Sequence, residues 1–235
     1  MVSAQGSSRA VHIVVLAKVP VAGHAKTRLA PALGVEGAAR LALKLLDHAL
    51  TQVVEACHGE PGVTPSVEAS SASDAWRVGR LSAELCVAPA PGHALWDGGA
   101  CLPSLRVTDQ GDGDLGQRMA RACQRVLASG SSVLLMGTDC PTLTAPLLRE
   151  SALRLQDHDA VVIPAFDGGY VLLGLRRYLP AVFEHMPWST ADVARLTVQR
   201  LEGNGFSVWR GPMLHDVDEP ADLGHLPPGW AVAPS

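Results

Sequence analysis

The sequence predicts an α/β fold of three layers, in which a mostly parallel, Rossmann-like central sheet is flanked by helices on both faces. Short apolar runs alternate along the chain with longer amphipathic segments, and loops containing glycine and proline separate them. Strands that alternate with helices pair in parallel, because each crossover helix returns the chain to the same edge of the sheet. The 235 residues, of which 47% are hydrophobic and 18% charged, are enough for one domain with a full core.

Buried strands are expected where aliphatic and β-branched residues continue without a polar alternation. The run Ser132–Met136 has the composition of a central parallel strand that is covered on both faces. The other clear strands are expected at 11–17, 160–163, 171–175 and 206–209. Between the strand expected at 11–17 and the one at 132–136, the pattern predicts short strands at 67–69 and 85–87 with a helix between them, followed by a loop over 89–103.

Helices are expected where apolar residues recur at helical spacing. The longest is predicted over 36–57 and ends at a cluster of glycine and proline. A second is predicted over 115–126, and a third begins after Thr144, a suitable N-cap, and continues to position 155. A fourth, capped by Ser189 or Thr190, continues to about position 201.

Composition and charge exclude several classes of protein. A net charge of −4 gives no general affinity for nucleic acid or for an anionic membrane surface. The five cysteines are odd in number, widely spaced and without a Cys-x-x-Cys pair, which argues against a disulfide framework and a zinc site. No apolar stretch approaches the length of a membrane span, and the N-terminus lacks a signal pattern. We therefore expect a cytoplasmic protein with reduced thiols and with neither a nucleic-acid nor a membrane partner.

The domain organisation expected from these patterns is simple. Residues 1–10 are polar and form a flexible N-terminus, residues 11–226 form a single domain, and residues 227–235 form a C-terminal tail. No internal repeat, low-complexity tract or long linker divides the sequence further.

The loop after the first strand is the strongest functional signal. Lys18, Lys26 and Arg28 lie within eleven positions, together with Gly23 and Thr27. This loop commonly binds phosphates in α/β proteins, and a guanidinium is able to form two parallel hydrogen bonds with one phosphate. It is not a Walker A loop, because no glycine directly precedes the lysine. The alternative is a solvated loop, but its position directly after a buried strand favours the binding of a polyphosphate.

Two acidic motifs are candidates for a metal site. Asp139 lies in Gly-Thr-Asp-Cys-Pro, directly after the predicted central strand, and Asp218 lies in the acidic segment 215–223. Mg²⁺ and Mn²⁺ bind a few carboxylate oxygens together with substrate phosphates and water. The alternatives are an ordinary strand-to-helix turn at Asp139 and a short helix capped by the acidic residues before Pro220. His215 is not expected to be a ligand, because hard cations prefer oxygen.

Three further motifs lie between the basic loop and the last acidic segment, at Gly113–Met119, Asp167–Tyr170 and Trp188–Thr190. The first opens a helix, whose free N–H groups are able to face an anion. The second also has the composition of a plain tight turn between strands. Tyr170 and Trp188 either stack on a sugar or base or pack in the core. Motifs of serine hydrolases, of zinc proteases and of Gly-x-Gly-x-x-Gly dinucleotide-binding proteins are absent from the sequence.

Taken in order, six motifs resemble a bacterial family of GT-A-type nucleotide-diphospho-sugar transferases. The shared pattern is A-K-x-P-x-x-G-x-x-K-T-R-L, G-D-L-G-x-R-M, G-T-D-x-P, D-G-G-Y, W-S-T and D-x-D-x-P-x-D-L. These motifs stand at 17–29, 113–119, 137–141, 167–170, 188–190 and 216–223. The basic loop and the last acidic motif are also similar to those of nucleotidylyltransferases, including the phospholactate guanylyltransferases.

The resemblance implies a GT-A fold and roles for individual residues. The residues implied at the nucleotide are Lys18, Gly23, Lys26, Thr27, Arg28, Gly116 and Arg118. Asp139 is implied as a metal ligand with Asp218 as the second, and the catalytic residues are Lys26, Arg28 and Asp139. The residues implied at the substrate are Asp167, Gly168, Gly169, Tyr170, Trp188, Ser189 and Thr190.

Together these features give three functional hypotheses. The first is an enzyme dependent on Mg²⁺ or Mn²⁺, a transferase that moves a sugar from a nucleoside diphosphate-sugar to a small acceptor. The second is a nucleotidylyltransferase, in which an NTP reacts with a phosphorylated small molecule and pyrophosphate leaves. The third is a non-catalytic nucleotide-binding protein. The base, the sugar, the acceptor and the oligomeric state are left open.

Overall fold

Seven strands form one sheet in the computed structural model, which describes residues 9–58, 81–96 and 105–230. The strands lie in the order β3-β2-β1-β4-β6-β5-β7. Their bounds are β1 Val11–Lys18, β2 Leu81–Ala88, β3 Arg106–Asp109, β4 Ser132–Met136, β5 Ala160–Pro164, β6 Tyr170–Leu175 and β7 Val208–Arg210. β6 is antiparallel to both of its neighbours, and every other neighbouring pair is parallel. The predicted α/β fold with a mostly parallel sheet is confirmed.

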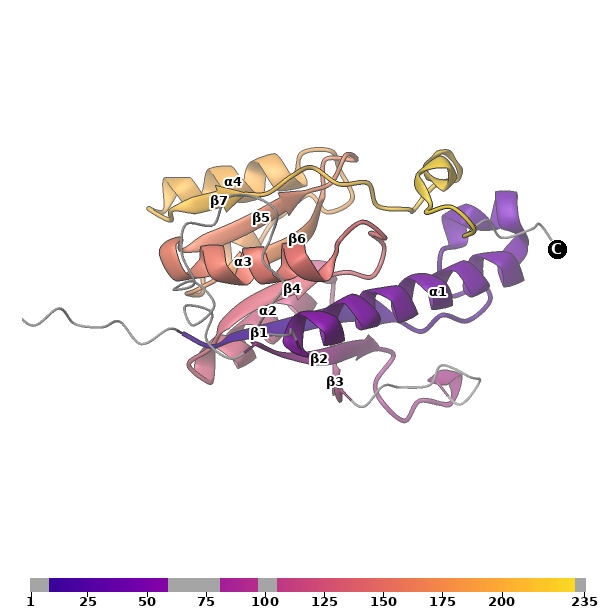
Figure 1. Ribbon diagram of the computed structural model, residues 1–235, viewed down its shortest axis with the longest axis horizontal. Helices are drawn as coiled ribbons and strands as arrows, with labels where there is room; N and C mark the ends of the chain where they lie inside the picture. The colour runs from indigo at the N-terminus through magenta and orange to yellow at the C-terminus, as the bar shows by residue number, and fades with distance from the viewer. Residues whose placement is uncertain (1–8, 59–80, 97–104, 231–235) are drawn as a thin grey trace, which may run out of the picture.

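Helices cover both faces of this sheet, which makes the three predicted layers (Figure 1). The helices are α1 Ala30–His58, α2 Leu115–Ala128, α3 Ala145–Asp157 and α4 Val193–Gly203, with short 3-10 helices η1 Thr27–Leu29, η2 Ala94–Trp96, η3 Pro180–Val182 and η4 Pro220–His225. Val53 of α1 and Leu148 of α3 are buried against one face. Met119 of α2 and Leu201 of α4 are buried against the other. Each fully buried aliphatic side chain contributes about 1.5–3 kcal/mol, so both helical layers stabilise the sheet.

β4 lies at the centre of the sheet, as its composition predicts. All five of its residues are buried. Leu134 and Met136 pack on the α1 and α3 side, while Val133 and Leu135 pack on the α2 and α4 side. A strand with no solvent face has no reason to alternate apolar and polar residues, and this explains its continuous apolar run.

A third apolar cluster brings the C-terminal segment onto the beginning of α1. Leu29, Leu41 and Leu45 pack with Val217, and Trp230 packs against the same cluster. η4, yellow in Figure 1, therefore lies beside the start of α1. This packing places the last acidic motif next to the basic loop.

Several strand predictions differ from the structure. β3 was not predicted, because all four residues of this edge strand are exposed or only partly buried and form no apolar run. β2 is longer than the expected strand at 85–87. The strand expected at 67–69 lies outside the described residues, as does part of the loop expected over 89–103. The described part of that loop contains η2.

The helix predictions differ at the N-termini. α1 spans Ala30–His58, but Gly34 (φ 71°, ψ 165°) is not helical and two helical segments meet there at a kink, so the longer second segment begins close to the expected position 36. The predicted cap of α4 was wrong, because the helix begins at Val193 and its N-cap is Asp192. Thr144 is the N-cap of α3, as predicted, but its side chain makes no capping hydrogen bond.

The described cysteines are free thiols, at positions 57, 86, 123 and 140. Cys86, Cys123 and Cys140 are buried and pack as small apolar side chains. Among the helices in the described ranges, none is both long and apolar enough to cross a membrane.

Candidate active site

The loops of the predicted site leave the sheet from one edge. β1 and β4 are parallel neighbours, so the loops that follow them begin side by side. The basic loop follows β1, and Asp139 lies three positions beyond β4. The backbone N–H of Val217 donates to the carbonyl of Asp139 at 2.9 Å, which attaches the C-terminal acidic segment to the same edge. Three segments far apart in the sequence therefore meet here.

Lys26 lies at the centre of this cluster. Its ammonium is 2.8 Å from Oδ1 of Asp139 and 3.5 Å from Oδ1 of Asp218, and it donates to the carbonyl of Val217 at 2.6 Å. The Lys26 side chain is only 6% exposed, whereas the two carboxylates are 46% and 41% exposed. The cation is thus enclosed, while both carboxylates keep part of their surface open to solvent.

The backbone of Lys26 is held in the left-handed region, with φ 49° and ψ 40°, where it precedes η1. This conformation costs a non-glycine residue about 1 kcal/mol or more, and such residues cluster at functional sites. The contacts of the ammonium and the buried side chain of Leu29 hold the loop in this shape.

Arg28 lies on the outer side of the cluster. Its guanidinium is 2.9 Å from Oδ2 of Asp218 and 3.6 Å from Oε1 of Glu219, and its side chain is 57% exposed. The carboxylate of Asp222 accepts from the backbone N–H groups of Asp218 (3.0 Å) and Glu219 (2.7 Å), which fixes the turn before η4. The structure therefore joins the predicted cations and carboxylates in one network, which we call the Lys26 network (Lys26, Arg28, Asp139 and Asp218).

Asp216 lies beside this network and is missing from the predicted site. Burial raises the pKa of its carboxyl, and the negative charges of Asp167 and Asp139 raise it further, against the opposing effect of Lys26, to about 6. The signal that identifies Asp216 in the sequence is the Asp-x-Asp spacing at 216–218, of which only the second aspartate was selected.

The chemistry of the Lys26 network fits a hard divalent cation. Asp139 and Asp218 already hold one cation, the ammonium of Lys26, between them. Mg²⁺ and Mn²⁺ commonly bind one or two carboxylates and complete their shell with substrate phosphates and water. Within the described residues no group of three His, Cys, Asp or Glu side chains is arranged to hold a metal. The donor set therefore suits a cation that shares its ligands with a nucleotide.

A polar cavity of about 420 Å³ lies at the ends of β1, β2 and β3. Lys18 and Arg118, two residues predicted at the nucleotide, both line it. The cavity is also lined by His24, Asp109 and Asp112, which were not predicted. Asp109 ends the edge strand β3, and His24 and Asp112 lie in loops, so no sequence pattern separates the three from other surface residues. Cations suited to phosphate and carboxylates suited to ribose hydroxyls thus line one cavity.

Hydrogen bonds, of which those made by Gln110 are buried, hold the wall of this cavity. The side-chain amide of Gln110 donates to the carbonyls of Ala17 and Cys86, at 2.9 Å each, and so ties the end of β3 to β1 and β2. Nε of Arg118 donates to the carbonyl of Gly113 at 2.8 Å. These bonds fix the orientation of the loop before a ligand binds.

The start of α2 differs in part from the expected anion site. Asp114 and Gln117 form a capping box, in which the Asp114 carboxylate already accepts from the N–H of Gln117 at 2.8 Å. Gly116 is buried, and a Cβ added there would lie 2.6 Å from the carbonyl of Phe183 and 2.8 Å from Nε1 of Trp188. Gly116 and Trp188 therefore pack against each other.

The motif Asp167–Tyr170 forms the tight turn between antiparallel β5 and β6, in line with the plainer of its two interpretations. Gly168 has φ 90°, and a Cβ added there would lie 2.1 Å from the carbonyl of Ala191, so no larger residue fits. The N–H of Gly169 donates to Oδ1 of Asp167 at 2.7 Å. The turn is rigid, and it leaves the Asp167 side chain exposed.

The remaining residues predicted at the substrate divide into two groups. Tyr170 and Trp188 are partly buried against the core on the α2 and α4 side, and the Tyr170 hydroxyl contacts Sδ of Met119 at 3.9 Å. Ser189 is exposed with φ 63°, and the hydroxyl of Thr190 donates to the carbonyl of Pro187 at 2.8 Å. The structure brings none of these four side chains into the Lys26 network.

The family of this chain follows from its match to a protein-family model. The model is described as an uncharacterized protein conserved in bacteria (DUF2064), and it matches residues 72–190, just over half of the chain. The chain belongs to this family. The comparison of the DUF2064 chain with curated proteins gives no match.

Solved structures similar to this DUF2064 protein share its fold. A protein from Desulfovibrio desulfuricans G20, provisionally assigned as a nucleotide-diphospho-sugar transferase, is 28% identical with a TM-score of 0.75, over 91% of this chain and 84% of that one. CMP:2-keto-3-deoxy-manno-octonic acid synthetase complexed with CTP is 12% identical with a TM-score of 0.51, over 92% and 96%. The manganese complex of Rv0371c from Mycobacterium tuberculosis H37Rv is 16% identical with a TM-score of 0.50, over 93% and 97%.

These comparisons confirm the predicted resemblance and fold class. The first of the three structures is the most informative for this DUF2064 protein, because it combines the highest identity of the three with the highest TM-score. The other two are too distant in sequence to show more than the fold. The transferase class predicted from the motifs agrees with the class given to the protein from Desulfovibrio desulfuricans G20.

Proposed function

We propose that this DUF2064 protein is a divalent-metal-dependent transferase that moves a sugar from a nucleoside diphosphate-sugar to a small acceptor. The observation that carries the proposal is the position of the Lys26 ammonium between the carboxylates of Asp139 and Asp218. This arrangement lies at the carboxyl ends of β1 and β4, where open α/β sheets bind ligands. The likeness to the protein from Desulfovibrio desulfuricans G20 supports the same class of reaction.

In the proposed complex, the nucleoside occupies the polar cavity at the ends of β1, β2 and β3. Lys18 and Arg118 line that cavity and face the phosphates. Asp109 and Asp112 accept hydrogen bonds from hydroxyl groups of the ribose. The basic loop connects this cavity to the Lys26 network, so the diphosphate extends from Lys18 toward Lys26 and Arg28.

The proposed chemistry is mainly electrostatic. Asp139 and Asp218 would hold Mg²⁺ or Mn²⁺, which, when bound, stabilises the negative charge that grows on the departing diphosphate. The ammonium of Lys26 and the exposed guanidinium of Arg28 would neutralise the phosphates, and the guanidinium would form parallel hydrogen bonds with them. Charges held in place before the reaction need little reorganisation during it, and this lowers the barrier.

A panel of thermal shifts tests the proposal. NDP-sugars and NTPs are each added with and without Mn²⁺, since a ligand that binds only the native state stabilises it by about 2.7 kcal/mol at a hundred times its Kd. We expect a rise in Tm with one class of NDP-sugar, and only with the metal. Absence of a shift with every nucleotide would overturn the proposal.

Nucleotidylyl transfer is the second candidate function, favoured by the amount of positive charge. Lys18, Lys26, Arg28 and Arg118 supply four cations, which is more than a diphosphate requires and suits a triphosphate. Release of pyrophosphate from mixtures of each NTP with sugar phosphates would establish this function in place of the first. Nucleotide binding that is independent of metal, without any turnover, would instead establish a non-catalytic nucleotide-binding protein.

A further inference from the structure

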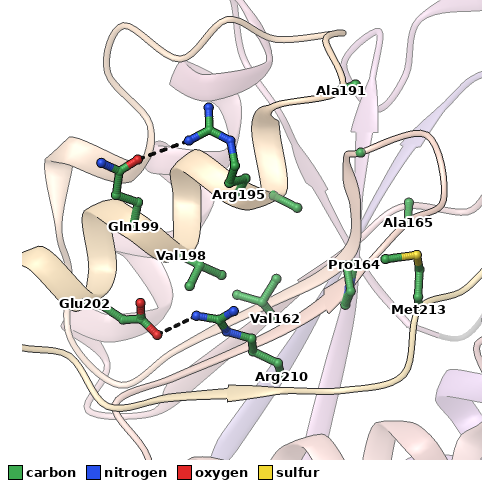
Figure 2. Close-up of a pocket in the computed structure, with 12 residues that line it drawn as sticks. Val162, Pro164, Ala165, Ala191, Arg195, Val198, Gln199, Glu202, Arg210 and Met213 are labelled. Carbon is green, nitrogen blue, oxygen red and sulfur yellow. Dashed lines mark hydrogen bonds and ion pairs between the residues drawn. The ribbon is translucent and has the colours of Figure 1, made fainter.

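A second cavity, of about 610 Å³, lies on the other half of the sheet between β5, α4 and the segment that follows β7 (Figure 2). Its walls are largely apolar and include Val162 and Pro164 of β5, Val198 of α4 and Met213. The proposed nucleotide site uses none of these residues. A concave, mainly apolar cavity of this size is typical of small-molecule binding sites.

The charged residues at the rim of this cavity neutralise each other. The guanidinium of Arg210 lies 2.7 Å from the carboxylate of Glu202, and that of Arg195 donates to Gln199 (Figure 2). The guanidinium of Arg195 also lies 2.9 Å from the carboxylate of Asp192. Both arginines that line the cavity therefore already have a carboxylate partner. The cavity offers apolar surface and paired charges, which favour a neutral ligand with an apolar body.

Printed backbone contacts connect the lining of the cavity to the Lys26 network. Ala165, which lines the cavity, forms a β-bridge with Leu214, and three residues further the N–H of Val217 donates to the carbonyl of Asp139 at 2.9 Å. Met213 lies three residues before Asp216, and three extended residues span about 10 Å. A ligand in the cavity thus lies within reach of the proposed donor site.

An exposed apolar side chain lies at the mouth of this cavity. Met213 lines the cavity and is 51% exposed, one of four large hydrophobic residues that the described part of the chain exposes. Apolar side chains left in water beside a cavity gain stability when an apolar ligand covers them.

We infer that this cavity binds the acceptor of the transferase, and that the acceptor is a neutral alcohol with an apolar body. The inference rests on the proposed function. The apolar body lies between Val162, Val198 and Met213, and the hydroxyl points past Gly168 toward the donor. The acceptor oxygen forms a bond with the anomeric carbon, and the bond between that carbon and the diphosphate breaks. The diphosphate leaves with the electron pair, and the exposed carboxylate of Asp167 takes the proton.

The test uses N-phenyl-1-naphthylamine, a neutral apolar fluorophore, on the full chain. We expect saturable binding to the wild type. Linear alcohols should displace the probe with about fourfold higher affinity for each added methylene, whereas glucose and glycerol should not displace it.

Two variants locate the binding. Ala194→Phe fills the cavity, and Met213→Asp places a charge at its mouth. Each should weaken probe binding at least tenfold, while Val35→Asp, at an exposed apolar residue of α1 (43%), should leave it unchanged. The nucleotide-dependent rise in Tm should persist in all three variants, which shows that they fold and retain the donor site.

Three outcomes distinguish failure of the acceptor site from failure of the proposed function. Unsaturable binding of the probe, or equal binding by wild type and both cavity variants, overturns the acceptor site while the nucleotide shift keeps the proposed function. Displacement by glucose as readily as by octanol overturns the apolar character of the acceptor. In the third outcome, the two cavity variants weaken probe binding but no nucleotide raises the Tm of the wild type. That result overturns the proposed function, and the acceptor role of the cavity with it.

Discussion

Two ion-pair networks in this molecule differ in which partner is buried, the cation in one and the carboxylate in the other. In the Lys26 network the cation is enclosed (6% exposed) and its carboxylates Asp139 and Asp218 are 46% and 41% exposed. Around Glu84 of β2 the carboxylate is enclosed (1% exposed) and its partner Arg125 of α2 is 37% exposed. The first network lies at the carboxyl ends of β1 and β4, where open α/β sheets bind ligands, and the second lies between β2, β1 and α2.

The difference in burial separates a ligand site from a structural contact. The carboxylate of Glu84 accepts hydrogen bonds from the two terminal guanidinium nitrogens of Arg125, from Nη1 at 2.8 Å, and from the hydroxyl of Thr108 at 3.2 Å. Nε2 of His12 lies 3.5 Å from it. Its oxygens are surrounded by protein donors, so they stabilise the fold and bind nothing further. The carboxylates of the Lys26 network retain exposed oxygen atoms and are able to accept a metal ion or a hydroxyl group.

The largest expected effect is the loss of activity on replacing a carboxylate of the Lys26 network. Asp139→Asn should lower kcat/KM by on the order of 100-fold or more, because it removes a charge that helps to stabilise the transition state. The fold should persist, because the enclosed ammonium of Lys26 keeps its contacts with Asp218 and with the carbonyl of Val217. Turnover of the donor identified by the thermal shifts is the measurement, and Asp47→Asn on the exposed surface of α1 is the control. Full turnover by Asp139→Asn would remove the role assigned to this carboxylate.

The second effect is on stability and concerns the enclosed network. Glu84→Gln should lower the free energy of unfolding by about 3 kcal/mol, because it breaks a buried ion pair and leaves Arg125 without its partner. Urea denaturation at pH 7 measures this change. The matched control is Glu150→Gln, which breaks the exposed pair with Arg154 on α3 and should cost less than about 0.5 kcal/mol. Equal costs for the two variants would contradict the distinction drawn between enclosed and exposed pairs.

The third effect is the pH dependence of the same contact. Burial by itself raises the pKa of Glu84, but the hydrogen bonds from His12 and Arg125 outweigh it and lower the pKa from 4.5 to about 2. The unfolded chain therefore binds the proton more readily, so the contribution of Glu84 is complete above pH 4.5 and is lost as the pH falls toward 2. The difference in unfolding free energy between wild type and Glu84→Gln should shrink over this interval. A difference that stays constant from pH 6 to pH 2 would show that Glu84 is not held ionised.

The smallest expected effect concerns the cation of the Lys26 network. The ammonium occupies the space between two carboxylates that the proposal assigns to Mn²⁺, so Lys26→Met should tighten Mn²⁺ binding in the absence of nucleotide by roughly tenfold. Calorimetric titration with Mn²⁺ alone measures this, and Lys44→Met, at an exposed contact of α1 with Trp230, is the control. Weaker Mn²⁺ binding by Lys26→Met than by wild type would show that the lysine does not compete with the metal.

The strands and the basic loop were predictable because their signals are local. The continuous apolar run at β4 and the cations after β1 are properties of adjacent residues, and both lie where the sequence predicts. β3 was missed because its residues are partly exposed at the edge of the sheet, and the cap of α4 was misplaced because Ser189 adopts φ 63°. Such local conformations depend on neighbouring segments that the composition of the loop does not describe.

The surroundings of individual side chains were also not predictable from the sequence. Tyr170 and Trp188 have residue types that suit a sugar as well as a core, and only the structure shows that they pack against Met119 and Gly116. The apolar cavity has no signal in the sequence, because its lining comes from β5, α4 and the segment after β7.

The sequence by itself determined which elements form and which charged groups the chain carries, because periodicity and composition act over short distances along the chain. The tertiary structure decided which of these groups meet. Lys26 and Asp218 are 192 positions apart, and they lie together because the burial of Val217 against Leu29 and Leu41 holds the last segment on the start of α1. That contact depends on the packed shape of two distant segments, so no pattern along the chain contains it.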